Sequence, residues 1–375
     1  MDKMKMKDTK FKFKVITPIF SYGADNGSER SEPEIRPASV KGMMRYMFRI
    51  AQPTLETKEL LEYENKIFGD AESKASPVRL AVVEHPKPDL KPSQFLHHKK
   101  QDGKYKKHFM KRSIQPDKNF SIRMSLRPKH LRDHLHFNEL KKRQHQGLSA
   151  VEKKEFERLE KEKLKDPSWY QSLLELSFVL VGLGQRSRRG RGRAQNIDVD
   201  RGLIDIDADQ MKCEILKRLN NASAVEKKFY KFNDNSLKTR IVPIENSRFR
   251  QDRPVIEIIV FGELISKGWE NFLESVDEAS HKIKLDRKKS SVKRSNHNIR
   301  GWYYATGWPK KPRFSSAIIA SIAETSDGFL PIYTCVKPVL YLKDSQKEEI
   351  LCTLNAKQEL DEFINHIESK GGGRL

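Results

Sequence analysis

The sequence predicts an α+β fold with two tandem domains of one ferredoxin-like class. Its 375 residues are enough for two domains. Apolar residues alternate with polar ones in some short segments and follow a helical period in others. Over residues 10–200 these segments come in the order strand, helix, strand, strand, helix, strand, with one extra helix. This βαββαβ order is the ferredoxin-like, or RRM-like, arrangement.

The first domain has every element of this pattern. Period-two alternation predicts its strands, and longer apolar stretches of helical period predict its helices. Ser39 is expected to be the N-cap of the first helix, and Gly69 to end the second. The expected elements are a strand over 10–19, helices over 39–51 and 55–68, strands over 77–85 and 120–128, a helix over 169–182 and a strand over 193–200.

A basic helical insertion, residues 86–167, is expected in this first domain. Its first part, residues 86–119, is rich in proline and lysine and predicts a long loop. Ser149 and Glu152 have the spacing of a capping box and begin a charged helix that ends before Pro167. Apolar positions are sparse along this helix, so we expect a solvated arm rather than a core element.

The domain boundary is expected near residue 203, which gives domains of residues 1–203 and 204–375. A helix over 208–220 bridges the two halves, and a basic, serine-bearing segment over 284–300 interrupts the later elements. The remaining expected elements are strands over 254–261, 313–323 and 329–342 and a C-terminal helix over 345–369.

The charge balance favours nucleic acid as a partner. Lysine and arginine number 73 against 51 acidic residues, a net charge of +22. Such a field attracts RNA, DNA or an anionic membrane. No apolar run approaches the roughly 20 residues of a spanning helix, and the N-terminus has no apolar segment of a signal peptide. Three widely separated cysteines fit a reducing compartment, so we expect a cytoplasmic protein.

The expected first helix carries a stripe of three cations. Lys41, Arg45 and Arg49 are spaced i, i+4, i+8 and therefore share one face. Like charges repel one another unless an anion lies across them, so the stripe predicts a polyanion site. The alternative is that these side chains reach solvent or pair with acids such as Glu32 or Glu34. Arg36 adds a cation where free backbone N–H groups also favour phosphate.

The stretch Gly182–Arg193, GLGQRSRRGRGR, holds five arginines and four glycines in twelve residues. Glycine permits positive φ and close backbone approach, and arginine forks onto phosphate oxygens. A Walker A loop or a Rossmann turn follows a strand and precedes a helix. Here an apolar helix comes first and a strand follows, so we expect a loop that contacts a phosphodiester chain.

No catalytic, metal or cofactor motif is evident. His130, His134 and His136 crowd one basic segment and are expected to be solvated, although His130 and His134 could share a metal if helical. Asp25 in the first loop is a candidate acid for activating a ribose 2′-hydroxyl. A later aromatic cluster could stack bases, form core or form a subunit interface; its members are Trp302, Tyr303, Tyr304 and Trp308.

Several of these motifs, in this order, resemble the RAMP superfamily of CRISPR-associated proteins, and most of all the first subunits of type III-B Cmr effector complexes. The family pattern has a Thr-Pro strand end, an Arg-Pro-x-Ser entry to a K-G-x-x-R helix, an I-F-G element and a glycine- and arginine-rich loop. In this sequence the matching positions are Thr17-Pro18, Arg36-Pro37 with Ser39, Lys41-Gly42 with Arg45, Ile67-Phe68-Gly69 and Gly182–Arg193.

The resemblance implies two RAMP domains and a non-catalytic, RNA-binding subunit at the head of a type III-B interference complex. Such a subunit would hold the guide RNA toward its 3′ end, with or without paired target. Its partners would be CRISPR guide RNA, single-stranded target RNA and other RAMP subunits in a prokaryotic cytoplasm, with no membrane, metal or cofactor. The expected RNA-binding residues are Arg36, Ser39, Lys41, Arg45, Arg49, Gly182, Gly184, Arg186, Arg188, Arg189, Gly190, Arg191 and Arg193.

Two other functions are compatible with a basic chain. One is a RAMP endoribonuclease that processes CRISPR transcripts, which would need a histidine or lysine at the scissile 2′-hydroxyl. The matched segments instead offer arginines, which stay protonated and are poor general bases. The other is a general RNA chaperone, which the ordered motif set disfavours.

Overall fold

The first sheet of the computed structural model has four antiparallel strands in the order β2-β7-β1-β8. These strands are β1 (Thr9–Val15), β2 (Val78–Glu84), β7 (Asn119–Leu126) and β8 (Ala194–Asn196). The structure describes residues 9–371 except 24–30, 71, 73–74, 87–91, 96–99, 102–103, 106–109, 163, 199–201, 204, 225–227, 234–237, 245–249, 251, 267, 292–315, 338–339, 345–346 and 352–355.

Period two places alternate residues of these strands in the core. Phe11, Phe13 and Val15 of β1 are buried, and Phe13 stacks on Phe120 of β7 with 5.3 Å between ring centroids. Lysines fill the other positions of β1, which are exposed or half-buried. The alternation in the sequence therefore predicts both the strand and its buried face.

The helices of this half are α1 (Pro37–Ile50), α2 (Thr57–Phe68), α5 (Pro167–Leu176) and the π-helical turn η3 (Ser177–Val181), which continues α5. Helix α1 begins two residues before the expected N-cap. Arg36 occupies the N-cap position with no side-chain capping bond, so the assignment of that role to Ser39 is wrong. Pro37 explains the earlier start, because proline suits the first helical turn.

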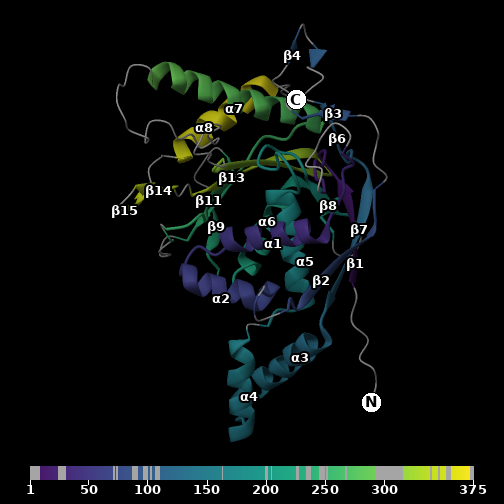
Figure 1. Ribbon diagram of the computed structural model, residues 1–375, viewed down its shortest axis with the longest axis vertical. Coiled ribbons are helices and arrows are strands. Elements are labelled where there is room, and N and C mark those ends of the chain that lie inside the picture. The colour runs from purple at the N-terminus through teal and green to yellow at the C-terminus, as the bar shows by residue number, and fades with distance from the viewer. Residues whose placement is uncertain are drawn as a thin grey trace.

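Short strands and an arm separate the elements of the first sheet. The strands are β3 (Pro92–Gln94), β4 (Lys100–Gln101), β5 (Lys104–Tyr105) and β6 (Met110–Arg112), in the segment expected to be loop. The arm is α3 (Pro128–Arg143), η2 (Gln144–Gln146) and α4 (Ala150–Lys161), and it projects from the body (Figure 1). The capping box of Ser149 and Glu152 is confirmed. His130, His134 and His136, which were expected to be solvated, lie on helix α3.

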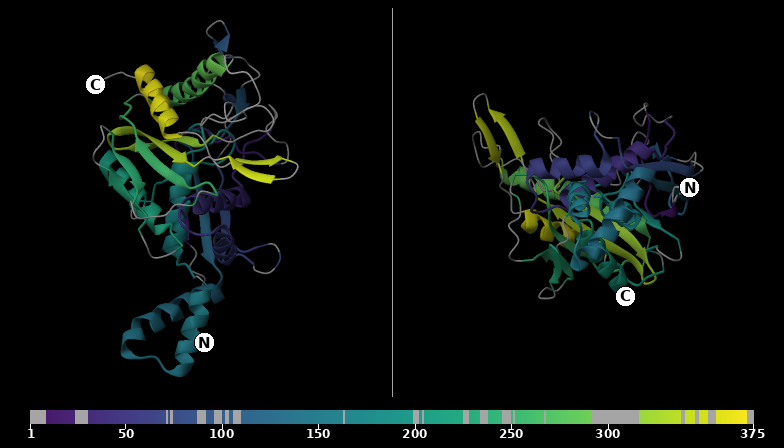
Figure 2. Two further views of the ribbon diagram at one scale, coloured as in Figure 1. Left: turned by 90° about the vertical axis from the view of Figure 1, so that its left-hand side faces the viewer. Right: turned by 90° about the horizontal axis from the view of Figure 1, so that it is seen from below.

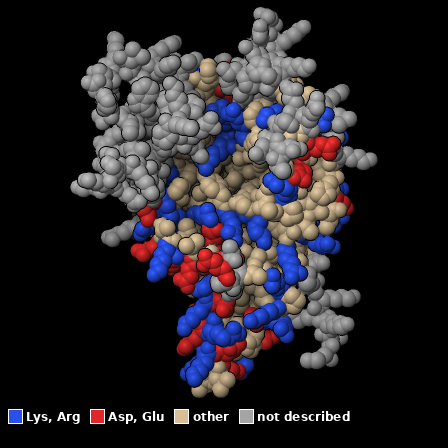
Figure 3. Space-filling view, in the orientation of Figure 1, with Lys and Arg blue, Asp and Glu red and all other residues tan. Residues whose placement is uncertain are grey.

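Acidic side chains are intermixed with the basic ones on the arm. Lys and Arg alternate with Asp and Glu over its surface (Figure 3), and Arg143 pairs with Glu152 at 2.8 Å across the arm. Phe137 of α3 stacks on Phe156 of α4 at 5.1 Å, which holds the two helices together. The arm is a helix pair that projects from the body (Figure 2), and Phe137 and Phe156 form a small apolar contact between its helices.

The second sheet has five strands in the order β12-β13-β11-β10-β9. They are β9 (Tyr230–Asn233), β10 (Arg240–Pro243), β11 (Ile256–Phe261), β12 (Ile318–Thr325) and β13 (Gly328–Val336), preceded by α6 (Ala208–Asn221). Helix α7 (Trp269–Ser291) includes the start of the basic segment expected to interrupt the elements. The C-terminal helix is α8 (Ala356–Gly371), and residues 347–351, expected to be helical, form β15 (Lys347–Leu351) with β14 (Leu340–Asp344).

The second sheet lies between two apolar layers. One hydrophobic cluster joins the first sheet, α1, α2, α5 and α6 to one face of the second sheet, through residues such as Ile259 and Ile332. A second cluster joins the other face, through Val260 and Tyr333, to α7 and α8. Helices α7 and α8 lie together over that face (Figure 1). The fold is therefore α+β with antiparallel sheets, as expected, and the halves share a core.

Within the described part of the chain, none of the helices has the length and apolar character needed to span a bilayer.

Candidate nucleic-acid interface

The glycine- and arginine-rich loop runs from η3 to β8, as its flanking pattern predicts. Four of its glycines have positive φ, between 75° and 90°, and Arg186 has φ 61°. Two glycines are required by close packing: a Cβ on Gly192 would lie 2.0 Å from the carbonyl oxygen of Leu183, and one on Gly184 2.5 Å from that of Phe20. The glycines therefore fold the loop onto the protein.

Backbone bonds join this loop to the edge of the second sheet. The N–H of Ala320 on β12 donates to the carbonyl oxygen of Arg188 at 3.1 Å, and Arg189 forms a parallel bridge with Ala320. On the other side, Thr17 Oγ1 donates to the carbonyl oxygen of Gly190 at 2.8 Å. The loop is thus a joint between the two sheets.

Arg191 is inside this joint, with a side chain that is 0% exposed. Both of its terminal nitrogens bond to the carboxylate of Asp277 on α7, at 3.3 and 2.5 Å. Arg189 also approaches Asp277, at 3.6 Å. One carboxylate from the second half therefore faces two arginines from the first.

Arg193 is also fully buried, but no carboxylate pairs with it among the described residues. Its Nη2 donates to the carbonyl oxygens of Ser187 at 2.7 Å and Ala320 at 2.8 Å. Burial lowers the pKa of this guanidinium to about 9. Arg191 and Arg193, both expected RNA contacts, have side chains with no exposed area that hold the loop.

The cationic stripe on α1 has an anion across it, and that anion belongs to the protein. Glu64 of α2 is 2% exposed on its side chain and accepts from Arg49 Nη2 at 2.7 Å, while Arg45 Nη1 lies 3.5 Å from it. Arg45 also donates to the backbone of Phe68 and Gly69. The stripe pairs with an acid, as the alternative interpretation proposed, but with Glu64 rather than Glu32 or Glu34.

Lys41 points toward strand β2 and away from the loop. Its Nζ donates to Ser76 Oγ at 2.8 Å and to the carbonyl oxygen of Val78 at 3.0 Å. Burial and the nearby Arg45 and Arg127 lower its pKa. The three cations of the stripe therefore connect α1 to α2 and to the start of β2.

A hollow of about 480 Å³ joins the start of α1 to the glycine- and arginine-rich loop. Arg36 and Ser39 line it from the helix, and Gly182, Gly184 and Arg188 line it from the loop. Helix α1 has neither a side-chain cap nor an acid in its first turn, so its free N–H groups keep their partial positive charge. The structure brings these five expected residues together.

Tyr46 lines the same hollow and holds Arg188, a contact that the sequence does not indicate. Arg188 Nη2 donates to the Tyr46 hydroxyl at 2.8 Å, and its guanidinium carbon lies 5.2 Å from the ring centroid. Arg188 also donates to the carbonyl oxygen of Ser316. Its guanidinium is half-buried at the wall of the hollow with no carboxylate partner among the residues described.

A second group of cations and aromatic rings lies beside the hollow. Arg186 is over the ring of Phe95 at 5.1 Å, and Lys111 is over the same ring at 4.6 Å and over Tyr22 at 5.9 Å. Burial and the nearby Arg189 lower the pKa of Arg186 to about 10, and burial and Arg186 lower the pKa of Lys111. Crowded cations next to aromatic rings suit a phosphate chain with exposed bases.

Lys111 and Phe95 were missed because they come from the segment expected to be loop. Their only signal in the sequence is the high lysine content of that segment. Pairing of β3 with β6 brings both residues to the hollow.

The remaining candidates do not extend the site. His130 Nε2 contacts the carbonyl oxygen of Lys165, and no group of three metal-ligating side chains occurs in the described segments. Asp25 lies outside the described residues, as do Trp302, Tyr303, Tyr304 and Trp308.

Comparison with known proteins connects this site to a family. A model of the RAMP superfamily matches residues 12–195. The CRISPR system Cmr subunit Cmr1-2 of Pyrococcus furiosus is 39% identical over 82 residues, which are 21% of this chain and 42% of that protein. The match therefore spans less than half the length of this relative.

Solved structures share the fold over nearly the whole chain. The crystal structure of Cmr1 from Pyrococcus furiosus in its apo form has a TM-score of 0.50 at 14% identity, covering 96% of each chain. A chain in the cryo-EM structure of the type III-B Cmr-beta complex bound to cognate target RNA has a TM-score of 0.53 at 12% identity, covering 96% of this chain and 99% of that one. The segment that matches the RAMP superfamily begins in β1 and ends in β8, directly after the glycine- and arginine-rich loop, so the similarity to that superfamily includes both α1 and the loop.

Proposed function

We propose that this chain is a non-catalytic, RNA-binding subunit of a type III-B Cmr interference complex. In this proposal it lies at the head of the filament and holds the guide RNA toward its 3′ end, alone or paired with target. Its partners are CRISPR guide RNA, target RNA and other RAMP subunits. The relatives named Cmr1 and the complex bound to target RNA support this assignment.

The observation that carries the proposal is the meeting of α1 and the loop at one hollow. An uncapped helix N-terminus, Arg36 and Arg188 supply positive charge there. Backbone N–H groups and arginines are the donors that most often hold phosphate oxygens. We propose that the RNA backbone lies in this hollow and that its bases lie next to the rings of Phe95 and Tyr22.

The expected residues have different roles at this site. Arg36, Ser39, Gly182, Gly184, Arg186 and Arg188 line or border the hollow and are the proposed RNA contacts. Lys41, Arg45, Arg49 and Arg189 add positive charge behind them while they bond to the protein. Gly190 is buried and keeps the loop in place.

The lining of the hollow favours binding over cleavage. An RNA-cleaving site needs a general base beside the 2′-hydroxyl. Among the described residues that line the hollow there is no histidine, lysine or carboxylate. A RAMP endoribonuclease at this position would need a base from outside the lining, such as Lys111 beside the hollow.

We also propose that the two halves are tandem ferredoxin-like domains divided near residue 203, with the arm and its neighbours inserted in the first. The first sheet has the order β2-β7-β1-β8, and the second repeats it in part as β12-β13-β11. Helix α7 follows β11, and α8 comes after β13 once the β14–β15 hairpin has intervened. In the first sheet the last strand in the chain, β8, lies beside β1. In the second sheet the corresponding place beside β11 is occupied by β10, which comes before β11 in the chain. Separate expression of residues 1–203 and 204–375 would test the boundary.

The test is RNA binding by the variant with Arg186→Ala and Arg188→Ala. Binding of a labelled, repeat-containing single-stranded RNA is measured by fluorescence anisotropy with EDTA present. We expect the affinity to fall at least tenfold, because two phosphate contacts are lost. The matched control is Lys153→Ala with Lys154→Ala, which removes the same charge from exposed positions of the arm.

Unchanged affinity in the loop variant, with both proteins folded by circular dichroism, would contradict the proposed site. Cleavage of the RNA at one position in EDTA would instead establish the endoribonuclease. Membership of a Cmr complex is tested separately, by co-purification of the wild-type chain with the other subunits and a guide RNA.

A further inference from the structure

One face of the first sheet packs on the core, and the opposite face carries exposed side chains. Phe11, Phe13 and Val15 of β1 are buried, so the lysines that alternate with them lie on the opposite face. Residues directly opposite each other on paired strands have their side chains on the same face, so the register identifies the other members. This open face has Lys10, Lys12 and Lys14 of β1, Asn119, Ser121, Arg123 and Ser125 of β7, and Arg79, Ala81 and Glu84 of β2.

Three cations of the open face form a diagonal row across three strands. The row runs from Arg79 on β2 through Arg123 on β7 to Lys12 on β1, and each step moves to the next strand and two residues along it. With the usual strand spacing and rise, the Cα atoms of neighbouring cations are about 8 Å apart. All three residues are exposed. A polyanion that crosses the sheet along this row would meet one cation on each strand.

The two other lysines of β1 on this face have acidic partners. Lys14 Nζ lies 2.7 Å from a carboxylate oxygen of Glu324 and 3.1 Å from one of Asp117. Lys10 pairs with Glu84, and both side chains are about half exposed. These acids therefore compensate the lysines on either side of Lys12 along the strand.

The two arginines of the row have no acidic partner. Arg79 and Arg123 make no hydrogen bond or ion pair in the described part of the chain. Arg123 is directly opposite Lys10, and like charges in that position repel each other unless an anion lies across them. Glu84 acts on the charge of Lys12 but is bonded to Lys10. The row therefore keeps positive charge that an external anion can meet.

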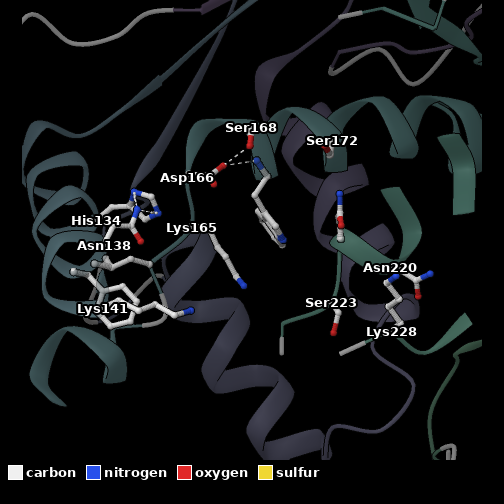
Figure 4. Close-up of a pocket in the computed structure, with 14 residues that line it drawn as sticks. His134, Asn138, Lys141, Lys165, Asp166, Ser168, Ser172, Asn220, Ser223 and Lys228 are labelled. Carbon is white, nitrogen blue, oxygen red and sulfur yellow. Dashed lines mark hydrogen bonds between the residues drawn. The ribbon is translucent and has the colours of Figure 1, made fainter. Parts of the chain in front are cut away.

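A second basic surface, a hollow of about 550 Å³ between the arm and the body, differs because its lysines are already bonded (Figure 4). Lys165 donates to the carbonyl oxygen of Ala224 at 3.2 Å, and Lys141 also has a partner. The arginines of the open sheet face are free of such bonds among the described residues. The sheet face is therefore the surface of the two that can receive an external anion without breaking a contact.

The open face also lacks aromatic rings. None of the side chains that β1, β2 and β7 place on it is aromatic. Sites for single-stranded nucleic acid stack the exposed bases on aromatic side chains. In an RNA duplex the bases are paired inside, and proteins recognise its shape, its phosphates and its 2′-hydroxyls. Exposed arginines and lysine without rings therefore suit a duplex backbone better than a strand with exposed bases.

We propose that the open face of the first sheet binds the phosphate backbone of an RNA duplex. Arg79, Arg123 and Lys12 contact phosphates and no base edge, so binding does not depend on sequence. The row shares no residue with the loop hollow, so the face itself does not rest on the proposed function. The choice of RNA rather than DNA does rest on it.

The test measures binding of a short, blunt-ended RNA duplex to the full chain by fluorescence anisotropy at low salt. Arg79→Ala with Arg123→Ala should weaken duplex binding at least fivefold, because two phosphate contacts are lost. Arg79→Lys with Arg123→Lys keeps both charges and should remain within about twofold of the wild type. The matched control is Lys153→Ala with Lys154→Ala, which removes the same charge from exposed positions of the arm and should leave the affinity unchanged.

A comparison of ligands separates this face from the loop hollow. The Arg79→Ala, Arg123→Ala variant should keep its affinity for single-stranded RNA within about twofold, and the Arg186→Ala, Arg188→Ala variant should do the same for the duplex. A duplex that does not bind the wild type, or that binds the wild type and the Arg79→Ala, Arg123→Ala variant equally, would overturn the proposal. Tighter binding of a glutamate-rich peptide or of a DNA duplex of the same sequence would overturn it as well, and would assign the face to that ligand.

Discussion

The burial of the Arg191 and Arg193 side chains is the feature that differs most from what their sequence context indicates. A stretch with five arginines in twelve residues is typical of a solvent-exposed nucleic-acid contact. The glycines were predicted to permit positive φ and close backbone approach, and they do. What the sequence could not indicate is the direction of each side chain, because Asp277 is 86 positions after Arg191 and Ala320 is 127 positions after Arg193.

Asp277→Asn should lower the free energy of unfolding by about 3–5 kcal/mol, measured by urea denaturation. The change removes the charge that pairs with the fully buried Arg191, and breaking one side of a buried pair leaves an uncompensated ion. The control is Asp277→Leu combined with Arg191→Met, which removes both charges. That double variant should recover more than half of the loss. Equal instability of the single and double variants would show that the ion pair does not explain the effect.

Among the helices, those with a strong apolar period were predictable, and those without it were not. Helices α1, α2 and α6 have bounds within about two residues of expectation, because their buried residues recur at helical spacing. Helix α3 has one buried residue, Leu140, so its sequence gave no apolar period to find. Strand β15 was expected to be helical, since its charged sequence continues into that of α8.

Arg49→Ala should lower the free energy of unfolding by about 1–3 kcal/mol, since Glu64 is buried and loses its bidentate partner. RNA affinity should fall less than it does in the Arg186→Ala, Arg188→Ala variant, because Arg49 links α1 to α2 and is not a proposed RNA contact. Both quantities are measured on the same preparation. Lys58→Ala on the exposed face of α2 is the control and should change stability by less than 0.5 kcal/mol. The opposite ranking of Arg49 and Arg188 in RNA binding would make the stripe the main contact.

At the scale of the whole molecule, net charge predicted the class of partner but not where it binds. Basic and acidic side chains are intermixed on the face that Figure 3 shows, and on the arm Arg143 and Arg158 pair with Glu152 and Glu155. The hollow lies between α1 and the loop, and the β3–β6 hairpin adds Lys111 beside it, so the proposed site draws on three distant segments. Motif order predicted the first two, and nothing in the sequence predicted the third.

The salt dependence of RNA binding should report how many phosphates the hollow contacts. With Arg36, Lys111, Arg186 and Arg188 engaged, the slope of log affinity against log salt should be about −2.8, from about −0.7 per phosphate on a single strand. Arg186→Ala with Arg188→Ala should reduce its magnitude by about 1.4. The measurement is anisotropy between 50 and 300 mM salt. A slope that is the same in wild type and variant would remove these arginines from the interface.

The bridge between Arg189 and Ala320 has a consequence for solubility. Strand β12 is the outermost strand of the second sheet, and an uncovered outer strand offers N–H and C=O groups that pair readily with another copy. The backbone of the loop pairs with that edge at Ala320, so the twelve residues that we propose as an RNA contact also occupy part of the edge. Changes that loosen the loop should therefore produce aggregates before they produce a soluble protein that fails to bind.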